Sequence, residues 1–157
     1  PCDCAMIVLT LKMIMNTKTE RIFELTAPYN NPYQGCARRV LFVCSVGMLR
    51  SPAAADLCAR EFGWNTRSCG TDLMAALIPL SVNLIAWADD IVFMNQENFL
   101  EAKILFAHVE EISEMLEKSS TIHISDQFDR DDTRLLCQIR EKVSALDIED
   151  ATGHPME

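Results

Sequence analysis

Positive charge is scarce in this 157-residue sequence, which has 14 Lys and Arg residues against 23 Asp and Glu residues and a formal net charge of −9. Proteins that bind nucleic acid or anionic membranes usually present a broad basic surface. The composition therefore argues against both kinds of partner. It still allows a small basic site for an anionic ligand, because a few arginines in one pocket outweigh a distant, screened acidic surface.

Paired metal ligands are also lacking. The seven cysteines are odd in number and irregularly spaced, and none of the three histidines lies near a cysteine pair. This pattern indicates neither a zinc site nor a disulfide framework. We therefore expect reduced thiols, as in a cytoplasmic protein, and we expect no metal or other cofactor.

A long apolar run is the third absence. The apolar stretch at residues 5–15 is shorter than the ~20 residues that a membrane-spanning helix needs, and it has no basic leading segment. A loop rich in Pro, Asn and Gly at residues 26–38 marks a boundary. We predict an N-terminal arm over 1–38, one domain over 39–148 and an acidic tail over 149–157. The arm is an optional upstream extension, an added strand or an oligomer contact, and the oligomeric state stays open.

What is present from residue 39 onward is an alternation of strand-like and helix-like segments. Short β-branched or aromatic runs predict strands at 39–43, 65–69, 90–94 and 121–124. Caps and helical spacing predict helices at 51–62, 78–88, 96–118 and 131–146. This alternation predicts an α/β fold with a four-stranded parallel sheet and helices on both faces. Ligands in such folds bind at the carboxyl ends of the strands.

Cys44 and Arg50 stand at the two ends of a short loop between the first strand and the first helix, in the stretch VLFVCSVGMLRSP. The first N–H groups of a helix lack intrahelical partners, so a loop curling over them forms an anion-binding nest. The Arg50 guanidinium offers paired donors to a phosphate, and Cys44 in the same nest would be stabilised as a nucleophilic thiolate. Ser51 is predicted to cap the helix, with Pro52 at its first position.

The residues of this loop are predicted to bind phosphate. Gly47 would supply the positive φ that a tight loop needs. Ser51 can also hydrogen-bond the sulfur of Cys44 and so favour the thiolate. The predicted phosphate-binding residues are Ser45, Val46, Gly47, Met48, Leu49 and Arg50.

An acidic segment, HISDQFDRDD at residues 123–132, follows the fourth predicted strand at the same edge of the sheet. A phosphatase needs a carboxylic acid there to protonate the leaving oxygen. Asp126 comes soonest after the strand and is our choice for that acid, with Phe128 as an apolar wall for a substrate ring. The spacing leaves three other carboxylates open: Asp129, Asp131 and Asp132.

Together these segments resemble the low-molecular-weight protein tyrosine phosphatase superfamily, above all its branch of short predicted tyrosine phosphatases in bacteria and phages. The resemblance covers residues 39–146 and includes VLFVCSVGMLRSP, TRSCGT, LIAWADDIVFM and ISDQFDRDD. It implies a three-layer α/β/α fold and hydrolysis through a phosphocysteine, without a metal. It assigns the nucleophile to Cys44, the phosphate clamp to Arg50, thiolate assistance to Ser51 and acid–base catalysis to Asp126. The implied substrate is a phosphotyrosine protein, with a small phosphorylated metabolite as the alternative.

The sequence departs from the family pattern at several positions. Gly47 stands where the family commonly has Asn, so no side chain braces the loop from that position. Leu49 replaces a second cysteine that protects the nucleophile, which predicts that this redox switch is absent, and Gln127 replaces a frequent Pro. Two alternative functions therefore remain: a phosphocysteine carrier, and a catalytically weak phosphate-binding regulatory module. Arsenate reductase ranks below them, because no relay pair stands out among the later cysteines.

Overall fold

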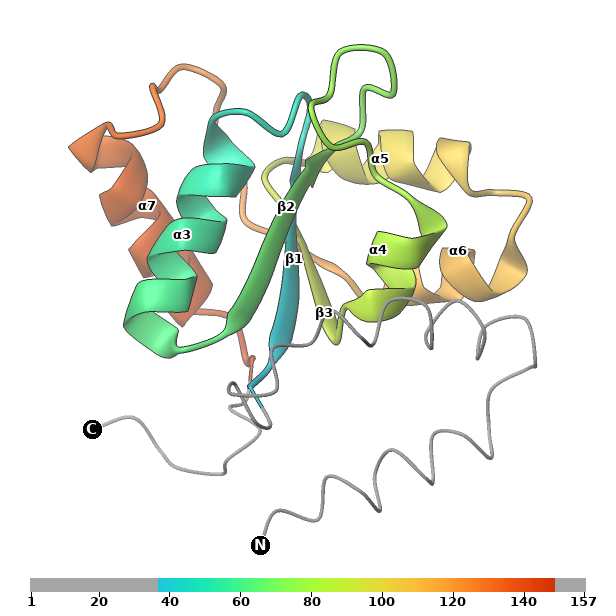
Figure 1. Cartoon of the computed structure of the whole chain (residues 1–157), viewed down its shortest axis with the longest axis horizontal. Helices are drawn as coiled ribbons and strands as arrows, with labels where there is room; N and C mark the ends of the chain where they lie inside the picture. The colour runs from blue at the N-terminus through green and yellow to red at the C-terminus, as the bar shows by residue number, and fades with distance from the viewer. Residues whose placement is uncertain (1–36, 149–157) are drawn as a thin grey trace, which may run out of the picture.

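The computed structural model describes residues 37–148, so the predicted arm, apart from residues 37 and 38, and the acidic tail lie outside the described residues. In chain order the elements are β1 (Arg39–Cys44), α3 (Arg50–Phe62), β2 (Asn65–Gly70), α4 (Val82–Trp87), β3 (Asp90–Phe93), α5 (Gln96–Leu105), α6 (Glu110–Glu117), β4 (Ser120–Thr121) and α7 (Thr133–Ser144) (Figure 1).

The four strands form one parallel sheet in the order β2-β1-β3-β4. β1 is central: it pairs with β2 along its whole length and with β3 from Val40 to Val43. The side chains of these four β1 residues are fully buried, as expected for an apolar parallel strand covered on both faces. The predicted α/β fold with a four-stranded parallel sheet is confirmed.

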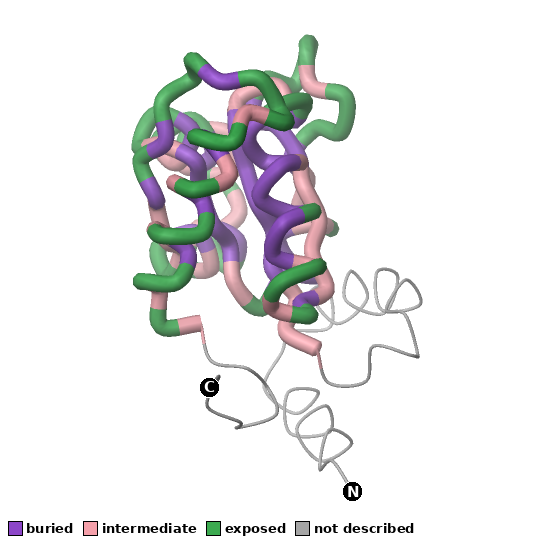
Figure 2. Tube along the Cα trace, turned by 90° about the vertical axis from the view of Figure 1, so that its left-hand side faces the viewer, coloured by how far each residue is buried: buried purple, intermediate pink, exposed green. Residues whose placement is uncertain are grey.

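Helices cover both faces of the sheet and give three layers (Figure 1). Side chains alternate along a strand, so Val40 and Phe42 pack under α3 and α7, whereas Leu41 and Val43 pack toward α4, α5 and α6. Buried residues follow the sheet and the inner sides of the helices, and exposed residues lie on the outer turns (Figure 2). These two cores hold rigid the carboxyl edge of β1, where Cys44 lies.

Three predicted elements differ from the structure by more than two residues at an end or in their number of helices. The predicted 96–118 helix is two helices, α5 and α6, because the chain turns over residues 106–109. The predicted 78–88 helix begins only at Val82, because Pro79 pairs with Gly70 at the end of β2 and Ser81 caps the helix. The predicted strand at 121–124 is reduced to β4, because His123 adopts a φ of 51°, which is not strand geometry.

Residues 37–148 contain neither a membrane-spanning helix nor a cluster of metal-ligating side chains. None of the helices described there is long and apolar enough to span a bilayer. In the same part of the chain, no three His, Cys, Asp or Glu side chains gather closely enough to hold a metal ion.

Candidate active site

Cys44 is the last residue of β1, and its side chain points into the loop formed by residues 44–50. It is 3% exposed. The Gly47 N–H donates to its Sγ over 3.2 Å, and the Ser51 hydroxyl lies 3.1 Å from the same atom. A sulfur that is surrounded by donors in this way is stabilised when it carries negative charge. The structure therefore brings Cys44, Gly47 and Ser51 together as predicted from the sequence.

The Ser51 hydroxyl also lies 3.2 Å from the carbonyl oxygen of Cys69. It has one proton, so it donates either to that carbonyl or to a Cys44 thiolate. The prediction that Ser51 caps α3 is wrong: α3 begins at Arg50, its N-cap is Leu49, and no side chain caps it. The hydroxyl turns inward toward sulfur instead, which leaves the first N–H groups of α3 without a side-chain acceptor. An anion held by the 44–50 loop would meet those donors.

Arg50 is buried, with 2% of its surface exposed. Its Nη1 donates to the Ile124 carbonyl oxygen over 2.9 Å, which ties the guanidinium to the segment that follows β4. Its Nε lies 3.0 Å from Oδ1 of Asp126, close enough for an ion pair but not aligned for a hydrogen bond. Nε therefore has no hydrogen-bond partner among the described residues, although buried donors almost always have one. An unpartnered donor in this place fits an anion site.

Two glycines allow the 44–50 loop to pack against the end of β2. Gly47 has a φ of 68°, which confirms the predicted positive φ. A Cβ there would also lie 2.9 Å from the backbone carbon of Cys69, so glycine is required for space as well as for conformation. A Cβ on Gly70 would lie 2.5 Å from the Ser45 carbonyl oxygen. The loop and β2 therefore meet backbone to backbone.

The 44–50 loop is braced by residues that were not predicted from the sequence. The N–H groups of Thr71 and Asp72 donate to the carbonyls of Cys44 and Ser45 over 3.0 and 2.9 Å. Asn98 on α5 is 1% exposed, and its Nδ2 donates to Ser45 Oγ over 3.0 Å. These contacts brace a loop that has no side chain at position 47. The only available signal was that Asn98 and Thr71 follow the ends of two strands at the carboxyl edge.

The predicted acid-bearing loop lies beside Arg50. The Asp126 side chain is 57% exposed, so it can reach both the guanidinium and solvent. Phe128 is buried in the core under α7, with the Arg134 guanidinium 5.4 Å from its ring centre. In this arrangement Phe128 anchors the loop, and its role as a wall for a substrate ring stays a prediction.

The other carboxylates of the loop lie in different settings. Asp132 caps α7 and forms an ion pair with Arg134. Hydrogen bonds from Arg134 lower the pKa of Asp132 below its usual value, which makes it a poor proton donor. Asp129 and Asp131 are exposed and are not ion-paired with any described residue. Asp126 is the carboxylate of this loop that contacts the buried arginine.

The other buried cysteines near the sheet are not alternative nucleophiles. Burial, with a smaller contribution from Glu61, raises the pKa of the Cys58 thiol to about 12. Burial raises the pKa of the Cys69 thiol even further above its ordinary value. Cys69 packs in the core under α4, α5 and α6, whereas Cys44 belongs to the core on the other face of the sheet. Cys44 also lies close enough to Cys69 to add a smaller electrostatic contribution to the rise of the Cys69 pKa.

Several solved proteins have a similar fold. SP-PTP, a low molecular weight protein tyrosine phosphatase from Streptococcus pyogenes, has a TM-score of 0.54 at 15% identity, covering 68% of this chain and 89% of its own. The tyrosine phosphatase amsI from Erwinia amylovora has a TM-score of 0.51 at 17% identity, covering 71% and 94%. Wzb from Vibrio vulnificus, solved with benzylphosphonate, has a TM-score of 0.51 at 15% identity, covering 69% and 95%. No protein-family model matches the sequence, and neither does any curated protein.

These likenesses define the class of fold. The chain has the α/β/α fold of the low-molecular-weight protein tyrosine phosphatases, as the resemblance in its motifs implied. At 15–17% identity the likeness establishes the fold alone, so the roles of individual residues depend on the geometry around the 44–50 loop.

Proposed function

We propose that this protein is a phosphatase that hydrolyses phosphate monoesters through a phosphocysteine on Cys44. One observation carries the proposal: the loop that holds Cys44 also holds a buried arginine whose Nε lies 3.0 Å from the Asp126 carboxylate and has no hydrogen-bond partner among the described residues. Cys44, Arg50 and Asp126, which we propose as nucleophile, phosphate clamp and proton donor, lie together at the carboxyl edge of the sheet. The shared fold supports phosphatase chemistry in general.

In the first step the Cys44 thiolate attacks phosphorus and forms a sulfur–phosphorus bond. The bond between phosphorus and the ester oxygen breaks, and protonated Asp126 gives its proton to that leaving oxygen. Arg50 Nε and the backbone N–H groups of the 44–50 loop stabilise the charge on the phosphoryl oxygens. Asp126 must leave Arg50 for this step, because the phosphate takes the place of its carboxylate beside Nε.

In the second step water attacks the phosphocysteine. The Asp126 carboxylate removes a proton from that water, the sulfur–phosphorus bond breaks, and inorganic phosphate is released. The electron pair of the broken bond returns to Cys44 as a thiolate. The Ser51 hydroxyl then turns from the Cys69 carbonyl toward the sulfur and stabilises it. The charges on the reacting groups are met by Arg50 and backbone dipoles, so this chemistry needs no metal or cofactor.

For the substrate we favour a phosphotyrosine protein, with a small phosphorylated metabolite as the alternative. The printed names of the Streptococcus pyogenes and Erwinia amylovora proteins describe tyrosine phosphatases, which supports this choice. We place the protein in the cytoplasm, where its cysteines would stay reduced. Nothing in its charge favours a nucleic-acid partner.

The test is hydrolysis of p-nitrophenyl phosphate at pH 5 to 7 with EDTA present. We expect turnover by the unchanged protein, no turnover by Cys44→Ser, and inhibition by orthovanadate. Insensitivity of the activity to Cys44→Ser would contradict the proposal. So would a protein that is inert while inorganic phosphate or vanadate raises its melting temperature, which would favour the carrier or regulatory module instead.

A further inference from the structure

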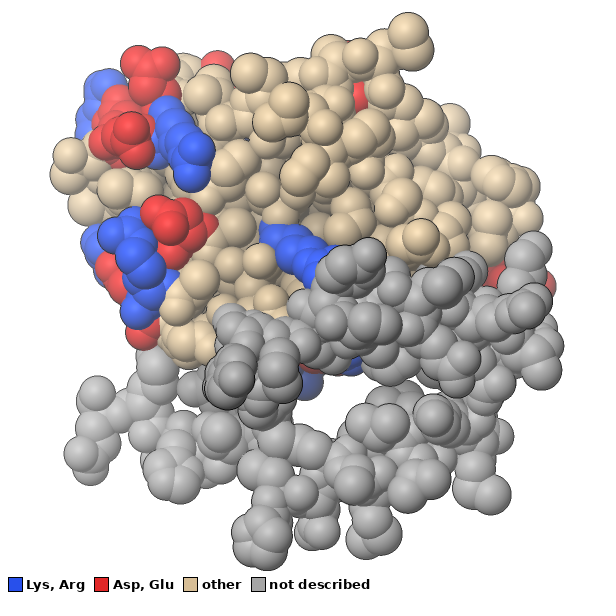
Figure 3. Space-filling view, viewed as in Figure 1, with Lys and Arg blue, Asp and Glu red and all other residues tan. Residues whose placement is uncertain are grey.

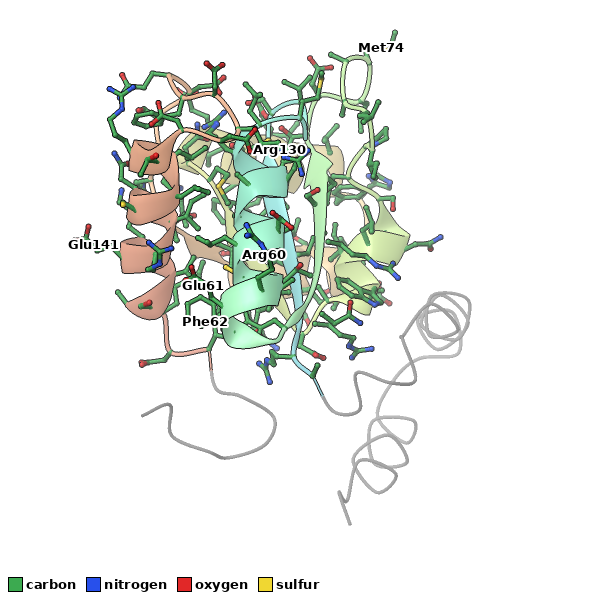
Figure 4. All side chains as sticks on the ribbon, turned by 60° about the vertical axis from the view of Figure 1, so that its left-hand side comes forward. Arg60, Glu61, Phe62, Met74, Arg130 and Glu141 are labelled. Atoms are coloured by element: carbon green, nitrogen blue, oxygen red, sulfur yellow. The ribbon has the colours of Figure 1, made fainter. Side chains whose placement is uncertain are left out.

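Large apolar side chains are exposed along one side of the 44–50 loop. Met48 and Leu49 belong to the loop itself, and both are exposed. Beside them, residues 71–79 carry four more exposed apolar side chains: Leu73, Met74, Leu77 and Ile78. Met74 is 96% exposed and stands at the outer tip of this segment (Figure 4). A contiguous group of exposed large apolar residues usually marks an interaction surface, whereas single exposed apolar residues are common on any protein.

The backbone of residues 71–79 holds these side chains outward in a fixed arrangement. The Asp72 carboxylate accepts from the N–H groups of Met74 and Ala75, each over 3.0 Å. The Leu77 N–H donates to the Val46 carbonyl in the 44–50 loop over 3.3 Å. A surface that is already ordered loses little conformational freedom when a partner binds. The apolar group is therefore built into the same unit as the phosphate-binding loop.

Charge differs sharply between the two sides of the loop. The sequence has no Lys or Arg between Arg67 and Lys103, and within residues 71–79 the one charged residue is Asp72. On the other side, residues 125–132 carry four carboxylates and one basic residue, Arg130, a net charge of −3, and Asp129 and Asp131 are among the exposed carboxylates. In Figure 3, charged side chains of both signs gather on the side of α7, whereas the surface on the side of the 71–79 segment carries almost no charged side chains.

This inference rests on the proposed function and extends it. We propose that the apolar surface beside the 44–50 loop docks a phosphorylated polypeptide. That surface consists of Met48, Leu49, Leu73, Met74, Leu77 and Ile78. The docked segment carries aliphatic residues on one side of its phosphorylated residue and basic residues on the other. Its phosphate enters the 44–50 loop, its aliphatic side chains cover the apolar surface, and its basic side chains face Asp129 and Asp131. This charge pattern defines the occupant.

Two other occupants fit less well. An anionic bilayer attracts surfaces where basic residues surround the apolar ones, and the 71–79 segment carries a carboxylate and no basic residue. A second copy of the chain seated on this surface would close the 44–50 loop to any substrate. A polypeptide that brings its own phosphate uses both features at once.

The test measures affinity for peptides with a non-hydrolysable phosphonate analogue of phosphotyrosine, by fluorescence anisotropy with the full-length protein. One peptide has Leu and Ile on one side and two Lys on the other; the second has Ser in place of Leu and Ile; the third has Glu in place of Lys. We expect the first to bind about tenfold or more tighter than the second, since covering even one aliphatic side chain contributes this much. The third should be weaker than the first by an amount that shrinks with added salt.

The matched variants are Met74→Ser/Leu77→Ser and Leu100→Ser/Ile104→Ser. Both pairs replace exposed apolar residues, but the second pair lies on α5. We expect the first pair to bring the affinity ratio of the first two peptides close to one, and the second pair to leave it unchanged. Equal affinity of the unchanged protein for those two peptides would overturn the proposal. So would binding to vesicles that contain phosphatidylserine without peptide selectivity, or dimerisation in sedimentation that the first variant pair abolishes.

The binding assay is independent of turnover, so the two proposals can fail separately. A protein that selects the first peptide but does not hydrolyse p-nitrophenyl phosphate supports the docking surface and refutes the phosphatase. A protein that hydrolyses p-nitrophenyl phosphate but binds all three peptides equally, or none, supports the phosphatase and refutes the docking surface.

Discussion

The two segments that flank the 44–50 loop are held by different means. On the β2 side, residues 71–79 bond to the loop through backbone groups: three N–H groups, from Thr71, Asp72 and Leu77, donate to its carbonyls. On the β4 side, residues 124–132 contact the guanidinium of Arg50 through the Ile124 carbonyl and the Asp126 carboxylate. The first attachment is rigid, because it consists of backbone hydrogen bonds. In the second, the contact with Asp126 can break and form again because that carboxylate is exposed, whereas the buried bond to Ile124 holds Arg50 in place.

This difference matches two chemical needs of the proposed reaction. The phosphate must be held in a fixed geometry relative to sulfur, and backbone contacts give that rigidity. The proton donor must move between the arginine, the leaving oxygen and a water molecule. A side chain that is 57% exposed and lacks an aligned hydrogen bond to Arg50 can do so at low energetic cost.

The largest expected effect comes from removing the proton donor on the movable side. Asp126→Asn keeps the size of the side chain but cannot protonate a leaving oxygen, so kcat should fall about a hundredfold or more. The loss should be larger for phenyl phosphate than for p-nitrophenyl phosphate, because phenolate is the poorer leaving group. Steady-state kinetics with both esters measures this.

Asp131→Asn is the matched control, since it removes an exposed carboxylate from the same loop. We expect its kcat to stay within about twofold of the unchanged protein. If Asp131→Asn or Asp129→Asn were the slow variant instead, the assignment of the acid to Asp126 would be wrong.

The next effect concerns the rigid side, where the loop and β2 touch through glycine. Gly47 and Gly63 share a φ of 68°, but a Cβ on Gly63 meets nothing within 4 Å, whereas a Cβ on Gly47 meets the Cys69 backbone at 2.9 Å. Gly63→Ala should therefore lower the free energy of unfolding by only ~1 kcal/mol, which is the strain of placing alanine at positive φ. Gly47→Ala should cost more, about 2 to 4 kcal/mol.

Urea denaturation of the two alanine variants checks this pair. Gly47→Ala should also abolish the rise in melting temperature that inorganic phosphate produces, whereas Gly63→Ala should retain it. Equal costs in the two variants would show that close packing against β2 is not what fixes the loop.

A smaller effect tests the brace from α5. Asn98 donates to Ser45 Oγ, so Asn98→Ala and Ser45→Ala should each destabilise the protein, and the double variant should cost less than their sum by about 1 kcal/mol. Asn95→Ala is the control, because Asn95 caps α5 without touching Ser45. Its cost, ~1 kcal/mol, should simply add to that of Ser45→Ala. If the losses of unfolding free energy of Asn98→Ala and Ser45→Ala simply added, the hydrogen bond between these residues would not brace the loop.

The smallest effect is electrostatic and lies at the end of the movable loop. Arg134 lowers the pKa of Asp132, so the stabilisation from this charge is present above the ordinary carboxyl pKa and is lost as the pH falls through the lowered one. Asp132→Asn keeps a side-chain oxygen to cap α7 but removes the charge. Its melting temperature should be slightly below that of the unchanged protein at pH 6 and equal to it near pH 2. A difference that persists at pH 2 would point to the cap rather than the charge.

The sequence predicted best what is local along the chain. The strand, loop and helix around Cys44 were predictable because an apolar run, a glycine and a helix start follow one another within a short segment. The position of Asp126 beside Arg50 was predictable because carboxyl ends of parallel strands share one edge. Both predictions needed only the sheet direction, which the alternation of elements supplies.

What could not be predicted depends on contacts between distant segments. Ser51 has the sequence of a helix cap, yet its hydroxyl serves Cys44 and Cys69, and only the fold brings β2 within reach. Asn98 occupies a helix position where either burial or exposure was plausible, and its bond to Ser45 spans 53 residues of sequence. Local preference gave way to tertiary contacts at these positions.

The bond from Arg50 Nη1 to the Ile124 carbonyl determines when the arginine side chain becomes ordered. A free arginine side chain carries about 2 kcal/mol of rotamer entropy, which is normally lost when it grips a ligand. Here the side chain is buried and fastened before any ligand arrives, so that loss occurs during folding. Any phosphate that enters the loop meets a guanidinium that is already immobile. Inorganic phosphate, the expected product, gains from this prior order as much as the substrate does.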